Sequence, residues 1–65
     1  MKQEIKDSIL EVFEEAKFKG NKATIHVDEL TTDEIVGIGM AATDHDFQIS
    51  CKRSGTGITV EMTVE

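Results

Sequence analysis

The apolar residues of this chain change their spacing at Gly20. Before it, Ile5, Ile9 and Val12 recur every three or four residues, as they do along the buried side of a helix. After it, every second residue is apolar in several short segments, which is typical of half-buried β-strands. A chain of 65 residues that combines both periods predicts one small α+β domain spanning residues 1–65.

The first segment predicts an amphipathic helix over residues 2–19. Its apolar side consists of Ile5, Ile9, Val12, Phe13 and Ala16. We expect Gly20 to end this helix, because glycine readily adopts the left-handed conformation that follows a last turn. On this reading Glu15 and Lys19 form an ion pair four residues apart.

Five carboxylates occupy the opposite side of the predicted helix, and we call them the acid face: Glu4, Asp7, Glu11, Glu14 and Glu15. Like charges three and four residues apart reduce helix stability, so their placement invites a functional explanation. The alternative is that they only keep a small domain soluble. We expect lysines and an arginine elsewhere to offset the acids of the loops, which leaves the acid face as the main uncompensated charge.

Four strands are expected after Gly20, with the turn 54–57 between the last two. The expected inward residues are Ala23, Ile25 and Val27 in the first strand, Val36, Ile38, Met40 and Ala42 in the second, Phe47, Ile49 and Cys51 in the third, and Ile58, Val60, Met62 and Val64 in the fourth. The predicted fold is therefore an N-terminal helix packed on one face of a four-stranded antiparallel β-meander.

The segment 32–42 allows a second interpretation. Thr31 followed by Glu34 matches a capping box, which would begin a helix there. Two glycines inside the segment would each cost such a helix close to 1 kcal/mol, so a strand is favoured. On the strand reading, the residues that point away from the helix are Ile35, Gly37, Gly39 and Ala41. Such a flat strip could receive a partner or a second copy of the chain, and the alternative is a twisted strand with nothing bound.

The charge balance limits the class of partner. The chain has 13 acidic and 7 basic residues, a net charge of −6, and neither Trp nor Tyr. Nucleic-acid binding depends on Lys and Arg, so direct binding to nucleic acid is not expected. No apolar run approaches the roughly 18 residues of a membrane span. The single cysteine, Cys51, cannot form an internal disulfide and suits a reducing compartment, so we expect a cytoplasmic protein.

Few residues could carry chemistry. Asp44, His45 and Asp46 are expected to form a solvated turn, because alternating side chains in a turn rarely converge on one metal ion. His26 is expected on the open face of the sheet and Cys51 on the inner face, which separates them. The sequence therefore predicts no catalytic residue, no metal site, no cofactor and no enzyme activity.

Three functional hypotheses follow. In the first, the chain is a small protein-binding module whose acid face docks on a basic, nucleic-acid-binding surface of a partner protein, as an inhibitor from a phage or mobile element would. Small acidic phage proteins are similar in size and charge, with no shared motif. In the second, it is a self-associating structural domain, such as a homodimer. In the third, it is a metal- or small-ligand-responsive module that uses His26 and His45.

Overall fold

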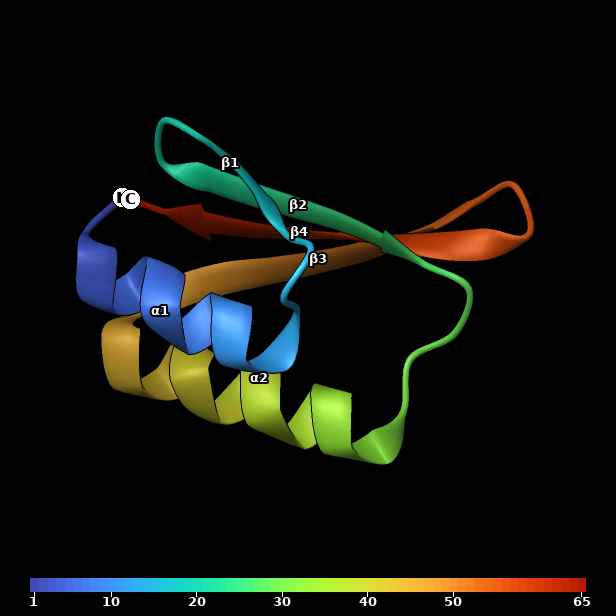
Figure 1. Ribbon diagram of the computed structural model, residues 1–65, viewed down its shortest axis with the longest axis horizontal. Helices are drawn as coiled ribbons and strands as arrows, with labels where there is room; N and C mark the ends of the chain where they lie inside the picture. Colours follow the sequence, from blue (N-terminus) through green and yellow to red (C-terminus); the bar gives the residue numbers. More distant parts are fainter.

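The computed structural model describes residues 1–65 and arranges two helices and four strands in the order α-β-β-α-β-β (Figure 1). The elements are α1 (Gln3–Val12), β1 (Lys17–Lys19), β2 (Lys22–Val27), α2 (Thr32–His45), β3 (Phe47–Ser54) and β4 (Gly57–Val64). The predicted α+β class is confirmed, whereas the predicted order of one helix followed by a meander is wrong. Neither helix has the length and apolar character that a membrane crossing requires.

The sheet has the strand order β1-β2-β4-β3, and every neighbouring pair is antiparallel. β2 and β3 therefore run parallel to each other, with β4 inserted between them. Parallel strands need a crossover connection, which is usually a helix, and α2 provides it. The meander prediction failed here because it joined successive strands by turns alone.

The segment 32–42, expected to be a strand, lies in α2. Thr31 is the N-cap of this helix: the Glu34 backbone N–H donates to Thr31 Oγ1 at 3.2 Å, and the Thr31 N–H donates to Glu34 Oε1 at 3.0 Å. A cap of this kind is worth about 1 kcal/mol. Asp33 and Glu34 add negative charge at the positive end of the helix dipole. The capping box, the first-turn charges and the burial of Ile38 and Ala41 together offset the cost assigned to the two glycines.

One of these glycines lies at the contact between the two helices. A β-carbon on Gly37 would lie 3.1 Å from Cγ2 of Val12, so α1 and α2 approach at a residue without a side chain. Ile38 and Ala41 are buried on the inner side of α2. Glycine at position 37 is thus a packing feature of a helix pair and not a sign of a strand.

The first helix is shorter than predicted, because it ends at Val12 instead of Lys19. Phe13 leaves the helical conformation (φ −126°, ψ 88°) and inserts into the core with 3% of its surface exposed. β1 occupies the end of the predicted helix, and Gly20 (φ 61°) makes the β1–β2 turn. The expected Glu15–Lys19 ion pair is absent, since Lys19 belongs to a strand.

Both helices cover the same face of the sheet, and the core lies between the two layers (Figure 1). Its ten buried residues are Ile5, Ile9, Phe13, Ala23, Ile25, Ile38, Ala41, Phe47, Val60 and Met62. Ala23 lies opposite Met62 and Ile25 opposite Val60, which confirms the alternation expected in these two strands. Cys51 was expected to be inward, but it is exposed. Burial along edge strand β3 decreases from Phe47 towards the β3–β4 hairpin.

Candidate docking surface

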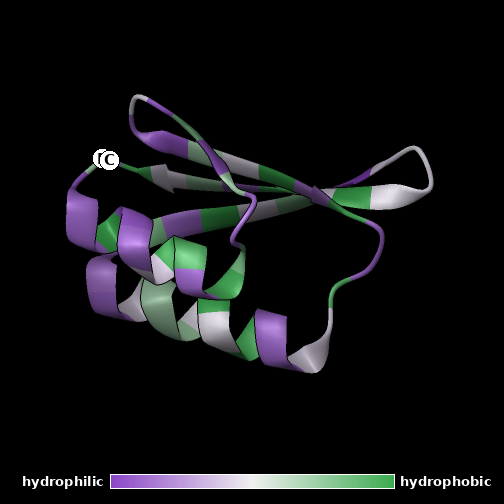
Figure 2. Ribbon diagram, in the orientation of Figure 1, coloured by the Kyte–Doolittle hydropathy of each residue, from purple (hydrophilic) through white to green (hydrophobic).

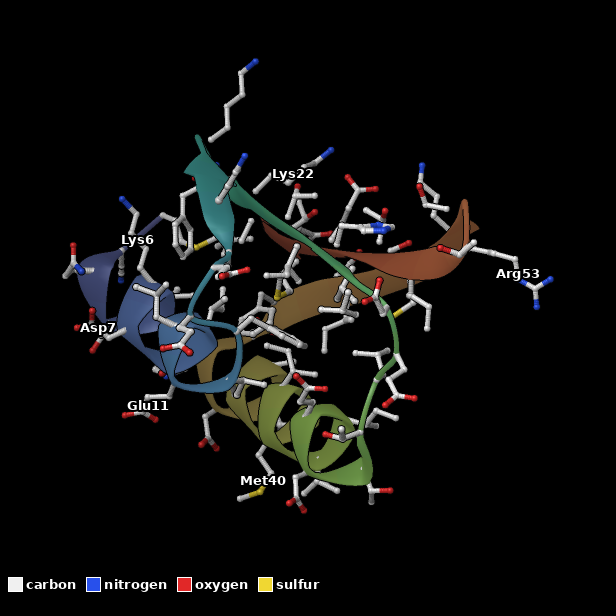
Figure 3. All side chains as sticks on the ribbon, turned by 45° about the vertical axis from the view of Figure 1, so that its right-hand side comes forward. Lys6, Asp7, Glu11, Lys22, Met40 and Arg53 are labelled. Atoms are coloured by element: carbon white, nitrogen blue, oxygen red, sulfur yellow. The ribbon has the colours of Figure 1, made fainter.

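α1 presents three acids on its outer side. Ile5 and Ile9 are buried against the sheet, with 5% and 0% of their surface exposed, so the opposite side of the helix faces solvent. Glu4, Asp7 and Glu11 are all exposed there, at spacings of three and four residues. In Figure 3, Asp7 and Glu11 lie on the outer side of α1, away from the sheet. The helical part of the acid face is therefore arranged as the sequence predicts.

Glu14 and Glu15 lie beyond the end of α1, in the turn that leads to β1, and both are exposed. Together with Glu34 of α2 they border a shallow hollow of about 220 Å³. Its apolar lining residues are Val12, Phe13, Ile25 and Val27. The acid face thus turns around the end of α1 towards α2, because the helix stops earlier than its charge pattern indicates.

No ion pair shorter than 4.0 Å involves the acid face. Only two ion pairs are shorter than 4.0 Å, and both involve Glu61 on β4, whose carboxylate lies 3.2 Å from Lys22 Nζ and 3.9 Å from Lys52 Nζ. The one polar side-chain contact to an acid-face carboxylate is neutral, a hydrogen bond of 2.9 Å from Gln3 Nε2 to Asp7 Oδ1. The negative charge of this surface is therefore uncompensated at short range.

α2 adds further negative charge to the same layer. Asp33 and Glu34 lie in its first turn, and Asp44 and its C-cap Asp46 lie at its other end. None of the four has an ion pair within 4.0 Å, so the basic residues expected to offset the loop acids do not pair with them directly. Asp44 and Asp46 lie at the end of the sheet that carries Lys22, but Lys22 is on the open face whereas the two acids belong to the helical layer.

His45, the one basic residue in the last turn of α2, contacts α1. Its Nε2 lies 2.9 Å from Ser8 Oγ, and the Ser8 hydroxyl also donates to the Glu4 carbonyl oxygen at 3.1 Å. Since a serine hydroxyl has one hydrogen to donate, Nε2–H of His45 is the donor to Ser8. His45 therefore joins the two helices, and the expected solvated turn around it is instead the end of α2.

The open face of the sheet carries the opposite charge. Its charged residues within the strands are Lys17, Lys19, Lys22, Lys52 and Glu61. Viewed as in Figure 3, Lys22 extends from the sheet on one side of the molecule, while Asp7 and Glu11 lie in the helical layer. The open face thus has a net positive charge, whereas the helical layer, which also contains Lys2 and Lys6, has a net negative charge.

The residues expected to form a flat apolar strip on the sheet do not share a face. Ile35 is 53% exposed, Ala41 is buried, and Gly37 packs against Val12. The predicted interface of Ile35, Gly37, Gly39 and Ala41 is therefore wrong as a surface, because residues two apart in a helix point in different directions.

A different apolar surface occupies the outer side of α2. Ile35 and Val36 are each 53% exposed and Met40 is 64% exposed, although Val36 and Met40 were expected to be inward. Gly39 lies between them on the helix surface. We call these four residues the α2 strip. Apolar residues run along the middle of α2 between its polar ends (Figure 2), and Met40 points away from the sheet (Figure 3).

The candidate chemical groups are far from one another. His26 lies on the open face, with Nδ1 3.3 Å from Thr59 Oγ1, whereas His45 lies in the helical layer on the other side of the sheet. Across residues 1–65, no three His, Cys, Asp or Glu side chains are placed to hold a metal ion together. The features that could recognise a partner are therefore the acid face and the α2 strip.

Comparisons of this chain with protein-family models, with curated proteins and with solved structures found no match.

Proposed function

We propose that this chain is a small protein-binding module whose acid face docks on a basic surface of another protein. The observation that carries the proposal is the separation of charge across the sheet. Glu4, Asp7 and Glu11 lie on the helical layer without a cation within 4.0 Å, while the lysines of the strands lie on the opposite face. Complementary charge steers association and selects partners by sign.

A protein that normally grips nucleic acid offers a surface of the required sign. Its Lys and Arg side chains are placed to neutralise phosphates, and exposed carboxylates at helical spacing present them with a row of negative charge. The helical layer adds Asp33 and Asp44 to the same side. In this proposal the module acts as an inhibitor, as proteins encoded by phages or mobile elements do, by occupying the partner's nucleic-acid site.

The test compares two variants of opposite faces. The acid variant combines Glu4→Gln, Asp7→Asn, Glu11→Gln and Glu14→Gln, and the control variant combines Lys17→Gln, Lys19→Gln and Lys22→Gln. Immobilised chains are incubated with extract of the cells that encode the protein, at about 50 mM and about 300 mM salt. We expect proteins that the parent and the control variant retain at low salt, and that the acid variant and high salt release.

A competition experiment follows on each retained protein. If the partner's basic site is the one occupied, duplex DNA or RNA should displace the module from it in proportion to nucleic-acid concentration. A set of retained proteins that the acid variant leaves unchanged would contradict the proposed function. If a partner is retained through the acid face but nucleic acid does not displace it, the docking proposal stands and the proposed inhibitor role is wrong.

Self-association is a second candidate, favoured by the exposure of Ile35, Val36 and Met40 on α2. Apolar side chains in this arrangement can be covered by another copy of the chain. Sedimentation over a series of concentrations distinguishes the two candidates. A monomer at high micromolar concentration would count against self-association and leave the docking proposal unaffected.

A further inference from the structure

The α2 strip is the most unusual apolar surface of this chain. Single exposed apolar residues are ordinary, but Ile35, Val36 and Met40 lie within two turns of α2, with Val36 and Met40 adjacent at a spacing of four residues, and each is more than half exposed. Only 11 of the 65 residues are buried in the fold. A cluster of three large apolar side chains outside so small a core indicates a surface that another molecule covers.

Gly39 gives an independent indication at the centre of the strip. A β-carbon on Gly39 would meet no atom within 4 Å, so the fold itself does not require a glycine there. Glycine is unfavourable inside a helix, and Gly37 differs because Val12 lies against it. The missing side chain leaves a notch beside Val36 and Ile35, three and four residues earlier in the helix, through which a partner can approach the backbone of α2.

Negative charge borders the strip on the side of α1. Asp33 and Asp44 follow it around α2 in the direction of Gly37, the residue that packs on α1, and both are exposed and without an ion pair. Asp7 and Glu11 of α1 lie further on the same side (Figure 3). The strip is thus an apolar seam with one acidic edge.

This charge decides between the two occupants that an apolar seam could have. A second copy related by a two-fold axis perpendicular to α2 would pair the strips with the helices antiparallel and bring both pairs of Asp33 and Asp44 to one edge. An axis along α2 would place each pair beside a second α2, which contains no Lys or Arg. Each copy also has a net charge of −6. A partner helix with an apolar seam and basic residues along one edge matches both the strip and its border.

We propose that the α2 strip binds a basic amphipathic helix of the partner protein, with its apolar seam on Ile35, Val36 and Met40 and its Lys or Arg residues beside Asp33 and Asp44. This inference rests on the proposed function and specifies the partner element that the acidic layer receives. The apolar seam orients the helix, and the charged edge chooses between the two directions in which it can lie.

A pair of synthetic peptides tests the inference. The first is a helix of about 18 residues, or five turns, with leucines on one side and arginines along one edge. The second has the same composition with the leucines dispersed around the helix. Each carries one Trp, whose fluorescence reports binding without background because the chain has neither Trp nor Tyr.

We expect the first peptide to bind the parent chain at least about tenfold more tightly than the second. The double variant Ile35→Gln/Met40→Gln should abolish that difference while keeping its helical circular dichroism, since both side chains are on the surface. Gly39→Gln should raise the melting temperature and weaken binding of the first peptide by about tenfold, because it fills the notch without meeting the fold. A purely structural glycine would not produce these opposite effects.

Three results would overturn the inference, and they differ in what they leave standing. If both peptides bind equally and the acid variant weakens both to the same extent, the α2 strip is not the binding site, and the proposal of docking through the acid face stands. Binding of the first peptide that is weakened neither by Asp33→Asn/Asp44→Asn nor by the acid variant removes the charged edge and the proposed function as well. A dimer in sedimentation that the Ile35→Gln/Met40→Gln variant dissociates assigns the strip to a second copy.

Discussion

Val12 of α1 packs directly over Gly37 of α2, where a β-carbon would lie 3.1 Å from Cγ2 and 3.8 Å from Cγ1 of the valine. Gly39, two residues further along the same helix, has no atom within 4 Å of the corresponding position. The two glycines of this helix therefore occupy different physical environments. Position 37 sets the distance between the helices, and position 39 shapes the outer surface.

The first prediction compares alanine at these two positions. Gly39→Ala should raise the free energy of unfolding by about 0.5–1 kcal/mol, the helix preference of alanine over glycine. Gly37→Ala should gain less, because the Val12 side chain must move by a few tenths of an ångström. In a Val12→Ala background, Gly37→Ala should give the full helix gain, because the valine side chain no longer obstructs it. The difference between the two backgrounds is the coupling energy of positions 12 and 37. Urea unfolding followed by circular dichroism measures each value, and equal gains at both positions would contradict the packing.

The second prediction concerns the capping box that begins α2. Thr31→Ala removes the acceptor of the Glu34 N–H, so it should lower the free energy of unfolding by about 1 kcal/mol. Thr31→Ser should keep most of the stability, since it keeps the hydroxyl. Thr32→Ala is the matched control, one residue further on and exposed, and it should change little. A loss at Thr32 equal to that at Thr31 would show that the cap is not the cause.

The two strands with clear alternation could be predicted from the sequence, but α2 could not. In an ordinary surface helix the outer side is polar, and this contrast produces the 3.6-residue period. Here Ile35, Val36 and Met40 are apolar on the outer side, while Ile38 is apolar on the inner side. Val36, Ile38 and Met40 therefore imitate the alternation of a strand. The failed prediction and the candidate docking surface therefore have one cause, apolar residues that the fold does not bury.

The residues of the acid face could also be predicted from the sequence, whereas the positions of the lysines relative to it could not. Glu4, Asp7 and Glu11 follow from helical spacing alone. The position of the lysines depends on the inserted strand β4 and on β1, which has only three residues and lies where a helix was expected. A local pattern cannot indicate which strands become neighbours. The separation of charge across the sheet therefore required the structure.

The third prediction concerns the thiol of Cys51. This side chain is exposed on an edge strand. Its rate of reaction with a disulfide reagent in the folded protein should therefore be no more than about fivefold lower than in urea-unfolded protein. Cys51→Ser should change the free energy of unfolding by less than about 0.5 kcal/mol. Strong protection of the thiol in the folded state would show that the cover over β3 extends further than its burial pattern indicates.

The fourth prediction concerns Gly57, which begins β4. A β-carbon there would overlap the Val27 carbonyl oxygen and lie 2.9 Å from His26 Nε2. Gly57→Ala should therefore lower the free energy of unfolding by about 1–3 kcal/mol. The addition of His26→Ala should not rescue it, because the Val27 contact is to the backbone. Full rescue by His26→Ala would assign the cost to the flexible imidazole instead.

The fifth prediction separates the acid face from the stability of the fold. The acid variant of four substitutions changes the net charge from −6 to −2, since it removes four of the 13 acidic residues. Its carboxylates have no nearby cation and repel one another at helical spacing, so the variant should be more stable than the parent by about 0.5–1 kcal/mol at low salt. Salt should raise the melting temperature of the parent more than that of the variant.

Two single substitutions give this last experiment its internal controls. Glu4 lies in the first turn of α1, where a negative charge favours the helix dipole, so Glu4→Gln alone should lower stability by about 0.3 kcal/mol or more. Glu11→Gln, in the last turn, should raise it by a similar amount for the same reason. A fold that loses stability when the whole acid face is neutralised would mean that these carboxylates serve the structure. A gain means that they are retained at a cost to the fold, as residues kept for a partner are.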